Sequence, residues 1–316
     1  MPKMGLSQDA ISHAYDIIDP IFLNSPQFEL DSLNDVLGTR IVLKVETLNP
    51  IRSFKGRGTD YFVKQHSHNS AFVCASAGNF GQGMAYACRR QNIPLTVFAA
   101  ETANSLKLEQ MRRLGAEVKL AGTDFDGAKA VAQAYALAEN HTFVEDGRED
   151  AVSIGAGTIG LELSHYPEPI QTLLIPVGNG ALINGIGAWF KANHPDTQII
   201  GVVATGAPSM NLSWRSGQLV PTETVDTISD GIAVRNPVAE ALQTMKSTVD
   251  DVVQVSDKAT LRAMKLIHHL GGIVVEPAGA VGLAAVLLYP ARFVGPLIAT
   301  PLCGSNLTEE QMRHWL

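Results

Sequence analysis

The chain has 316 residues, of which 46% are hydrophobic and 17% are charged, and its formal net charge is −7 at pH 7. These values predict a soluble globular protein of one or two domains and argue against a nucleic-acid-binding protein, which would present a basic face. The three cysteines, Cys74, Cys88 and Cys303, form no CxxC motif, which indicates reduced thiols rather than disulfides or a zinc site.

Short apolar segments rich in β-branched residues predict strands that recur along the whole chain. In chain order they cover residues 40–46, 70–76, 94–100, 116–122, 171–178, 198–206 and 296–304. Helical patterns lie between them at Phe80–Arg90, Ser105–Leu114, Phe125–Glu139 and Leu182–Ala192. This alternation predicts an α/β protein built from βαβ units around parallel sheet.

Four glycine-containing turns follow predicted strands. They are "RSFKGRG" (52–58), "SAGNFGQG" (76–83), "VGNGALINGIG" (177–187) and "PLCGSN" (301–306). Each turn alone is as readily a tight turn as a binding loop. Open α/β sheets place their ligands at the carboxyl ends of strands, so four such turns together predict a ligand site.

The third turn opens a helix, and the backbone N–H groups of such a helix start form an anion site. It is not a dinucleotide fingerprint, because Ile183 stands where the third glycine of G-x-G-x-x-G belongs. No Walker lysine-serine pair occurs either. We therefore expect a small phosphorylated ligand here.

Lys55 lies in the first of these four segments, directly after Phe54 and between Arg52 and Arg57. A phosphate-bearing aldehyde needs both an anion site and an amine that forms a Schiff base, which is the arrangement of pyridoxal phosphate enzymes. Two neighbouring cations would disfavour the protonated amine and help to keep Lys55 nucleophilic, and Phe54 would pack against the cofactor.

These motifs together resemble the fold-type II pyridoxal phosphate enzymes, and within them the serine/threonine dehydratase family, over nearly the whole chain. "NPIRSFKGRG" resembles the lysine motif, "SAGNFGQGMAYACRR" the asparagine loop and "PVGNGALINGIG" the phosphate loop. "ISDGIAV" (228–234), "VEPAGAVGLAAVL" (275–287) and "PLCGSN" complete the resemblance.

The resemblance implies a role for each matching residue. Lys55 is the Schiff-base and catalytic lysine, and Cys303 stands beside the pyridine nitrogen. The asparagine-loop residues that would hold the substrate carboxylate are Ser76, Ala77, Gly78 and Asn79. The cofactor would be bound by Phe54, Lys55, Asn79, Gly178, Asn179, Gly180, Ala181, Leu182, Gly231 and Cys303.

The chain also departs from the family pattern. Arg52 stands where a small residue is common, and Phe80 stands where histidine is common. Both positions lie close to the substrate in the family, so the identity of the substrate stays open. Val203 and Ser209 replace the glutamate and aspartate that bind a divalent cation in some relatives, so we expect no metal site. Ala77 replaces the serine of the family's racemases, which predicts a dehydratase rather than a racemase.

The implied fold has two domains of open twisted sheets with flanking helices, like the tryptophan synthase β-subunit, with the cofactor between them. We expect residues 1–67 and 152–316 to form the larger, cofactor-binding domain and residues 68–151 the smaller domain with the asparagine loop. The chain ends soon after "CGSN", so we expect no effector-binding domain. "EDGRED" (145–150) predicts an exposed loop, with a substrate role for Asp146 or Arg148 as the alternative.

The expected function is dehydration and deamination of a 3-hydroxy amino acid to a 2-keto acid and ammonia. Serine, threonine, a phenylserine-type substrate and hydroxyaspartate remain open. The alternatives are β-replacement of the cysteine-synthase kind and, outside the family, an NAD-dependent oxidoreductase. The N-terminus lacks the apolar core of a secretion signal and no apolar segment is long enough to cross a bilayer, so we expect a cytoplasmic protein without membrane or nucleic-acid partners. The family resemblance implies a homodimer.

Overall fold

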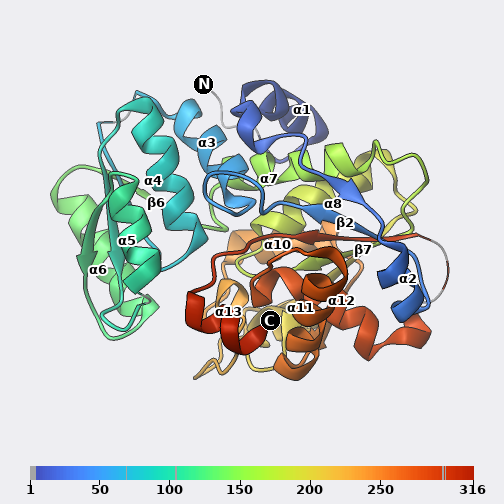
Figure 1. Cartoon of the computed structure of the whole chain (residues 1–316). Coiled ribbons are helices and arrows are strands. Elements are labelled where there is room, and N and C mark those ends of the chain that lie inside the picture. The colour runs from blue at the N-terminus through green and yellow to red at the C-terminus, as the bar shows by residue number, and fades with distance from the viewer. Residues whose placement is uncertain (1–4, 69, 104, 294, 296) are drawn as a thin grey trace.

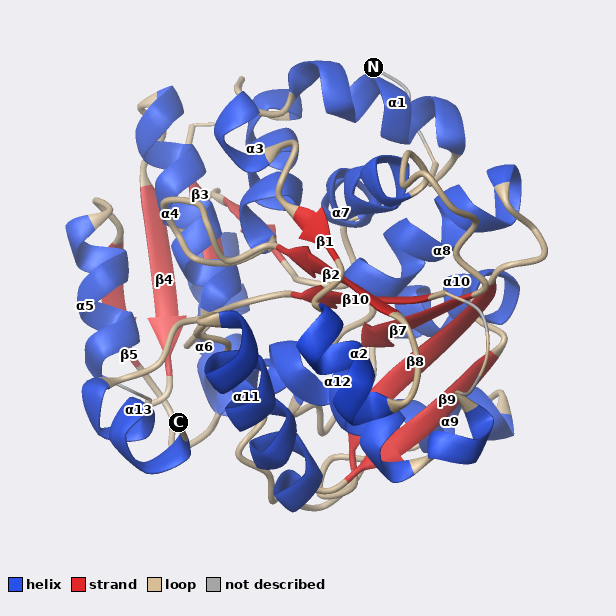
Figure 2. Cartoon of the chain, turned by 45° about the vertical axis from the view of Figure 1, so that its right-hand side comes forward, coloured by secondary structure: helices blue, strands red, loops and turns tan. Residues whose placement is uncertain are grey.

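The chain folds around two separate β-sheets (Figures 1 and 2). A computed structural model describes residues 5–316 except residues 69, 104, 294 and 296. The larger sheet has the strand order β1-β2-β10-β7-β8-β9, and the smaller has the order β5-β4-β3-β6. The predicted α/β architecture is confirmed, and each strand and helix predicted from the sequence is present.

The larger sheet is parallel except at one edge. Its strands are β1 (Gln27–Phe28), β2 (Ile41–Val45), β7 (Thr172–Pro176), β8 (Gln198–Ala204), β9 (Asp251–Val255) and β10 (Ile298–Leu302). The two-residue strand β1 pairs antiparallel with β2, whereas the pairs of β10 with β2 and of β7 with β8 are parallel. The sheet is therefore mixed, which the apolar segments did not predict because β1 has neither their length nor their composition.

The smaller sheet is parallel throughout its described strands. These are β3 (Phe72–Ala75), β4 (Leu95–Ala99), β5 (Glu117–Leu120) and β6 (Thr142–Val144). All four lie within the 68–151 segment predicted as the smaller domain. One apolar cluster nevertheless joins Phe62 and Val152, which lie outside that segment, to residues of β3 and β4. The domain boundaries themselves stay a prediction.

The helices cover both sheets (Figure 2). They are α1 (Gln8–Ile17), α2 (Asp31–Leu37), α3 (Lys55–Gln65), α4 (Asn79–Gln91), α5 (Ser105–Arg113), α6 (Phe125–Ala138), α7 (Asp150–Leu163), α8 (Ala181–Asn193), α9 (Ser209–Ser216), α10 (Ala239–Thr248), α11 (Asp257–Gly271), α12 (Pro277–Leu288) and α13 (Glu309–Trp315). Short 3-10 helices cover Pro20–Phe22, Asp230–Ile232 and Pro290–Arg292. None of the helices in the described part of the chain combines the length and the apolar composition that crossing a bilayer requires.

Helix α7 lies in the middle of the molecule, against α3 and α8, and its residues 152–163 are all buried. Its glycines permit this close packing. A Cβ atom added to Gly155 would lie 2.6 Å from Cα of Gly58 in α3. A Cβ atom added to Gly185 in α8 would lie 2.2 Å from the carbonyl oxygen of Ser153. The three helices can therefore come this close only because glycine has no side chain at these positions.

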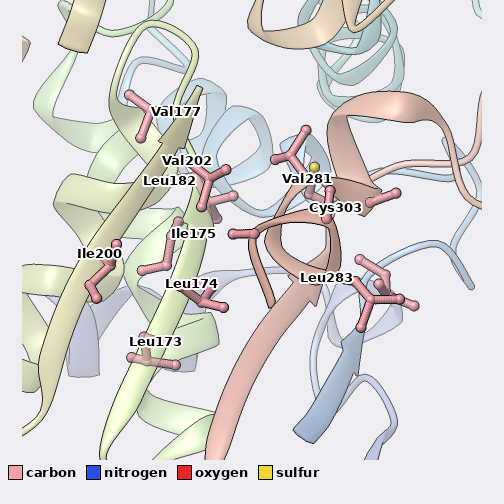
Figure 3. Close-up of a cluster of buried hydrophobic side chains, with 14 of the residues drawn as sticks. Leu173, Leu174, Ile175, Val177, Leu182, Ile200, Val202, Val281, Leu283 and Cys303 are labelled. Atoms are coloured by element: carbon pink, nitrogen blue, oxygen red, sulfur yellow. The ribbon is translucent and has the colours of Figure 1, made fainter. Parts of the chain in front are cut away.

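The main apolar core lies on the larger sheet. Figure 3 shows Leu173, Leu174 and Ile175 of β7 beside Ile200 and Val202 of β8. Strands buried on both faces in this way have continuous apolar sequences, which is why they could be predicted. Leu182 and Cys303 belong to the same core and also line the cavity described below. The core thus supports one wall of that cavity directly.

Candidate active site

A cavity of about 560 Å³ opens where the strands of both sheets end and the following helices begin. Its lining comes from the starts of α3, α4, α8 and α12, together with the 3-10 helix at Asp230–Ile232. A volume of this size suits a cofactor together with a small substrate. The carboxyl ends of β3, β6, β7 and β10 thus converge on one site, as expected for open α/β sheets.

All of the site residues predicted from the sequence line this one cavity. They are Phe54, Lys55, Ser76, Ala77, Gly78, Asn79, Gly178, Asn179, Gly180, Ala181, Leu182, Gly231 and Cys303. Phe80, whose role was left open, lines it too. The fold therefore brings together four turns that are separated by up to 250 residues, and the individual role of each residue remains a prediction.

Lys55 is the first residue of α3, and its amine points into the cavity. Nζ donates hydrogen bonds to both carboxylate oxygens of Asp146, each at 2.7 Å. It also lies 4.8 Å from the ring centroid of Phe54 and 5.8 Å from that of Phe80, where an ammonium group is attracted to the ring faces. The Lys55 side chain is 13% exposed, so the amine is largely shielded from solvent.

The predicted effect of Arg52 and Arg57 on Lys55 is wrong. The guanidinium of Arg57 is buried and binds the carboxylates of Glu46 and Glu162, at 2.8 and 2.6 Å. Arg52 is exposed, and its carbonyl oxygen accepts a hydrogen bond from the Ser305 N–H. A fully buried cation needs anionic partners, so Arg57 turns into the protein interior rather than towards the cavity.

Glycine is the N-cap residue at two of the helix starts that line the cavity. Gly78 is the N-cap of α4, and Gly180 is the N-cap of α8. Gly180 has φ +92°, which a residue with a side chain rarely adopts, so glycine is needed to turn the chain into α8. Backbone N–H groups at such helix starts attract anions, so the cavity that holds the Lys55 amine offers two anion sites.

The asparagine loop is held in shape by its own residues and by the C-terminal part of the chain. Ser76 Oγ accepts hydrogen bonds from the N–H groups of Gly78 and Gly81. The side-chain amide of Asn79 donates to Glu276 at 2.7 Å and accepts from Asn306 Nδ2 at 2.8 Å. The side chain of Asn79 is therefore fixed from both ends.

Glu276 is a cavity residue that the sequence analysis did not single out. It is buried, and burial raises the pKa of its carboxyl group to about 7 against the opposing effect of Lys107. Its second oxygen accepts a hydrogen bond from the N–H of Asn306. The available signal was a charged residue within the apolar segment "IVVEPAG", just before Pro277 at the start of α12.

Cys303 lies at the end of β10, where its sulfur borders both the core and the cavity (Figure 3). Burial raises the pKa of its thiol, and the neighbouring Glu276 adds to this effect. The side chain therefore remains a neutral thiol at neutral pH. Cys74 lies inside β3, fully buried, and is a small core residue as expected.

The turn at 145–148 was expected to be exposed, with a site role only as the alternative. Asp146 instead lines the cavity with its carboxylate against Lys55, whereas Arg148 pairs with Glu145 and with Glu240 of α10. Gly147 has φ +86° and is buried against the phosphate loop, where an added Cβ atom would lie 2.3 Å from the Asn179 carbonyl oxygen. Asp146 is thus the residue that this turn presents to the site.

Ion pairs cross the cavity between the two sheet regions. Lys107 of α5 pairs with Asp230, and Arg235 pairs with Asp124 and Asp126 at the start of α6. All five residues line the cavity. Although burial opposes it, Asp230 and Glu276 together raise the pKa of Lys107, so this lysine is cationic at neutral pH.

Val203 and Ser209, which stand where some relatives have metal-binding carboxylates, make other contacts. Val203 is fully buried in β8, and the hydroxyl of Ser209 donates a hydrogen bond to the Val234 carbonyl. Over the described residues, no group of three or more histidine, cysteine, aspartate or glutamate side chains is arranged to hold a metal ion. The absence of a divalent-metal requirement remains a prediction.

The residues of the cavity fit pyridoxal phosphate. The group needs a lysine amine, an anion site for its phosphate and an apolar wall beside its ring. The cavity supplies Lys55, the start of α8 at Gly180, and the ring of Phe54. The phosphate loop also packs closely against Gly231, since a Cβ atom added to Gly178 would lie 2.9 Å from the Gly231 carbonyl oxygen.

Comparisons with known proteins agree with this fit. The sequence pattern of the family described as pyridoxal-phosphate dependent enzyme matches residues 18–304. The biosynthetic L-threonine dehydratase of Lactococcus lactis is 32% identical over 320 residues, which cover 98% of this chain and 77% of that protein. The L-threonine ammonia-lyase of Thermotoga maritima is 34% identical over 278 residues, covering 87% and 69% of the two chains.

Solved structures show the same likeness. The processed form of threonine deaminase isoform 2 from Solanum lycopersicum superimposes with a TM-score of 0.89 at 29% identity, over 98% of this chain and 88% of that one. Maize serine racemase gives a TM-score of 0.92 at 24% identity, covering 98% and 97% of the two chains, and at that identity it shows the shared fold alone.

Proposed function

Because the chain belongs to the family of pyridoxal-phosphate-dependent enzymes, we propose that it dehydrates and deaminates L-threonine or L-serine. It is an ammonia-lyase whose products are a 2-keto acid and ammonia. One observation carries the choice of site: the Lys55 amine lines the same cavity as two helix starts, at Gly78 and Gly180, that attract anions.

The two anion sites would serve different groups. The start of α8, with Gly178 and Asn179 before it, would hold the cofactor phosphate. The start of α4, shaped by Ser76, would hold the substrate carboxylate, and Asn79 at its first turn would contact the cofactor ring. The Cys303 thiol would face the ring nitrogen as a weak hydrogen-bond partner.

When bound, pyridoxal phosphate supplies an electron sink that stabilises negative charge at the α-carbon of an amino acid. Lys55 would take the α-proton, because its amine lines the cavity and belongs to the segment that resembles the lysine motif of the family. Loss of the 3-hydroxyl group as water requires a proton from a group close to the β-carbon. The cavity walls formed by Phe54 and Phe80 limit the access of bulk water during this step.

Keto acid release from a panel of 3-hydroxy amino acids tests this function. Purified enzyme should release 2-oxobutanoate from L-threonine or pyruvate from L-serine, and borohydride reduction should fix the cofactor mass on the peptide that contains Lys55. Lys55→Ala should lose both properties, whereas Lys258→Ala on the exposed face of α11 should keep them. Consumption of substrate only when a thiol nucleophile is added would indicate β-replacement instead.

A homodimer in the cytoplasm is the finer proposal that membership of this family supports. Light scattering of the purified enzyme should give twice the mass of one chain. A monomeric mass with full activity would contradict the dimer.

A further inference from the structure

Asp146 places a carboxylate directly against the proposed catalytic amine. Both of its oxygens accept hydrogen bonds from Lys55 Nζ at 2.7 Å, and its side chain is 18% exposed. A group that accepts the α-proton must come within hydrogen-bond reach of the α-carbon. Asp146 therefore lies next to the place where the α-carbon of a substrate and its substituents would be bound.

The fold holds this carboxylate in place from both sides. Glu145, the preceding residue, pairs with Lys129 of α6, and Arg148 pairs with Glu145 and with Glu240 of α10. Gly147 follows directly and lies against the phosphate loop. Asp146 is thus positioned by contacts to α6, α10 and the phosphate loop rather than by Lys55 alone.

The charges of the cavity leave Asp146 without a second cation. Four cationic residues line the cavity within the described chain, and three of them have other acidic partners: Lys107 with Asp230, Lys129 with Glu145, and Arg235 with Asp124 and Asp126. Only Lys55 contacts Asp146 among them. A Lys55 amine that takes the α-proton must itself be uncharged, so it no longer balances the Asp146 carboxylate, which then faces the substrate with its charge uncompensated.

We propose that Asp146 is a specificity-determining residue that rejects substrates with a second carboxylate on the β-carbon. This inference rests on the proposed function. A neutral side chain with a 3-hydroxyl group, such as that of threonine or serine, can donate a hydrogen bond to Asp146. A β-carboxylate would instead bring a second negative charge to a shielded anion, and such a pair is disfavoured. The substrate class is thereby narrowed to monocarboxylic 3-hydroxy amino acids, and 3-hydroxyaspartate is excluded.

Two ligands that differ in the charge of the β-substituent test the proposed role of Asp146. L-aspartate and L-asparagine have nearly the same shape, differ in the charge on the β-substituent, and lack the leaving hydroxyl group. Calorimetric titration of the holoenzyme should show L-asparagine binding at least about tenfold more tightly than L-aspartate, because like-charge contacts are costly and 1.4 kcal/mol corresponds to a factor of ten. Asp146→Asn should bring this ratio below about threefold. Asp146→Ser removes the same charge and should give the same result if the asparagine variant fails to fold.

Glu223→Gln is the control, because Glu223 is an exposed carboxylate on the cavity lining that does not contact Lys55. It should keep the wild-type ratio. A ratio near one in the wild-type enzyme, or an equal change in Glu223→Gln, would overturn the role of Asp146. If the wild-type enzyme releases no keto acid from L-threonine or L-serine but keeps the binding ratio, the proposed function fails while the role of Asp146 stands.

Discussion

At the scale of single residues, the surroundings of Glu276 change the acidity of its carboxyl group. Burial raises the pKa of its carboxyl group from the usual 4.5 to about 7. Between these two pH values the folded chain keeps a proton that the unfolded chain has released. The folded state therefore binds more protons, and its free energy of unfolding falls as the pH rises through this window. The contribution is fully present below pH 4.5 and is lost above about pH 7.

We expect Glu276→Gln to remove this pH dependence. A shift from 4.5 to about 7 corresponds to about 3 kcal/mol. Denaturant unfolding at pH 4.5 and pH 8 should show a larger loss of stability in the wild-type protein than in the variant, by roughly that amount. Equal pH dependence in both proteins would show that Glu276 titrates normally. A hydrogen bond from Asn306 that the glutamine loses would lower stability equally at both pH values, so it does not affect the difference in stability between them.

We predict that Ala77 decides whether the α-proton can be returned from the opposite side. Racemisation needs a second acid–base group facing the one that removes the proton. Ala77 carries a methyl group, Asn79 is held by Glu276 and Asn306, and Asp146 contacts Lys55 itself. We therefore expect L-serine in deuterated water to give pyruvate without D-serine, as measured by chiral chromatography. Ala77→Ser should introduce D-serine, and its formation by the unmodified enzyme would contradict this argument.

The site residues that could be predicted from the sequence are those inside local patterns. The glycine loops at 76–83 and 177–187 begin at a strand end, and Lys55 is the first residue of the helix that follows β2, so their neighbours along the chain reveal them. The contacts of Lys55 with Asp146 and of Asn79 with Glu276 span 91 and 197 residues. Such contacts depend on how the two sheet regions meet, and no short segment carries that information. The interpretation of Arg57 failed for the same reason, because its partner Glu162 lies 105 residues away.

At the scale of elements, α7 depends on glycine for its position between α3 and α8. A Cβ atom at Gly155 would lie 2.6 Å from Cα of Gly58 and 2.7 Å from the carbonyl oxygen of Arg57. Backbone atoms cannot move aside as a flexible side chain can, so α3 and α7 would have to separate. Separation would also disturb the buried pairs of Arg57 with Glu46 and Glu162.

Gly155→Ala should therefore destabilise the protein by about 3 kcal/mol, at the upper end of ordinary overpacking. The urea concentration at the midpoint of unfolding measures this. Gly127→Ala in α6 is the matched control, since its Cβ atom would have no neighbour closer than 3.2 Å and alanine favours the helix. If both variants unfold at the wild-type midpoint, the packing of α7 is looser than these distances indicate.

The elements themselves were predictable where composition and length agreed. Strands β2, β7, β8 and β10 are apolar segments of five to seven residues, typical of strands buried on both faces. Strand β6 has three residues and β1 has two, which is too short for a pattern. Helix α7 has glycines at 155, 157 and 160, and glycine lowers helix propensity, so its sequence did not indicate a helix. Tertiary packing outweighs that propensity here.

At the scale of the whole molecule, the cavity lies where two sheet regions meet, and charged side chains connect them across it. Arg235 lies in the larger-sheet region after the 3-10 helix at Asp230–Ile232, whereas Asp124 and Asp126 begin α6 on the smaller sheet. Lys107 and Asp230 form a second connection. Figure 1 shows α4, α5 and α6 grouped on one side and α8, α10 and α12 on the other.

These pairs should control access to the cavity more than they control stability. The Arg235 side chain is 32% exposed, and partly exposed ion pairs contribute about 0–1 kcal/mol to folding. Arg235→Gln should therefore leave the unfolding midpoint nearly unchanged.

Without the ion pairs of Arg235 the two sheet regions separate more easily, so the variant should release pyridoxal phosphate severalfold faster and show a raised KM for the amino acid. Capture of the released cofactor by a hydrazine reagent that condenses with its aldehyde group, followed by fluorescence, measures the first effect directly. Arg313→Gln, which breaks an exposed pair with Glu309 within α13, is the control and should release the cofactor at the wild-type rate. Equal release rates in all three proteins would show that these ion pairs do not hold the cavity closed.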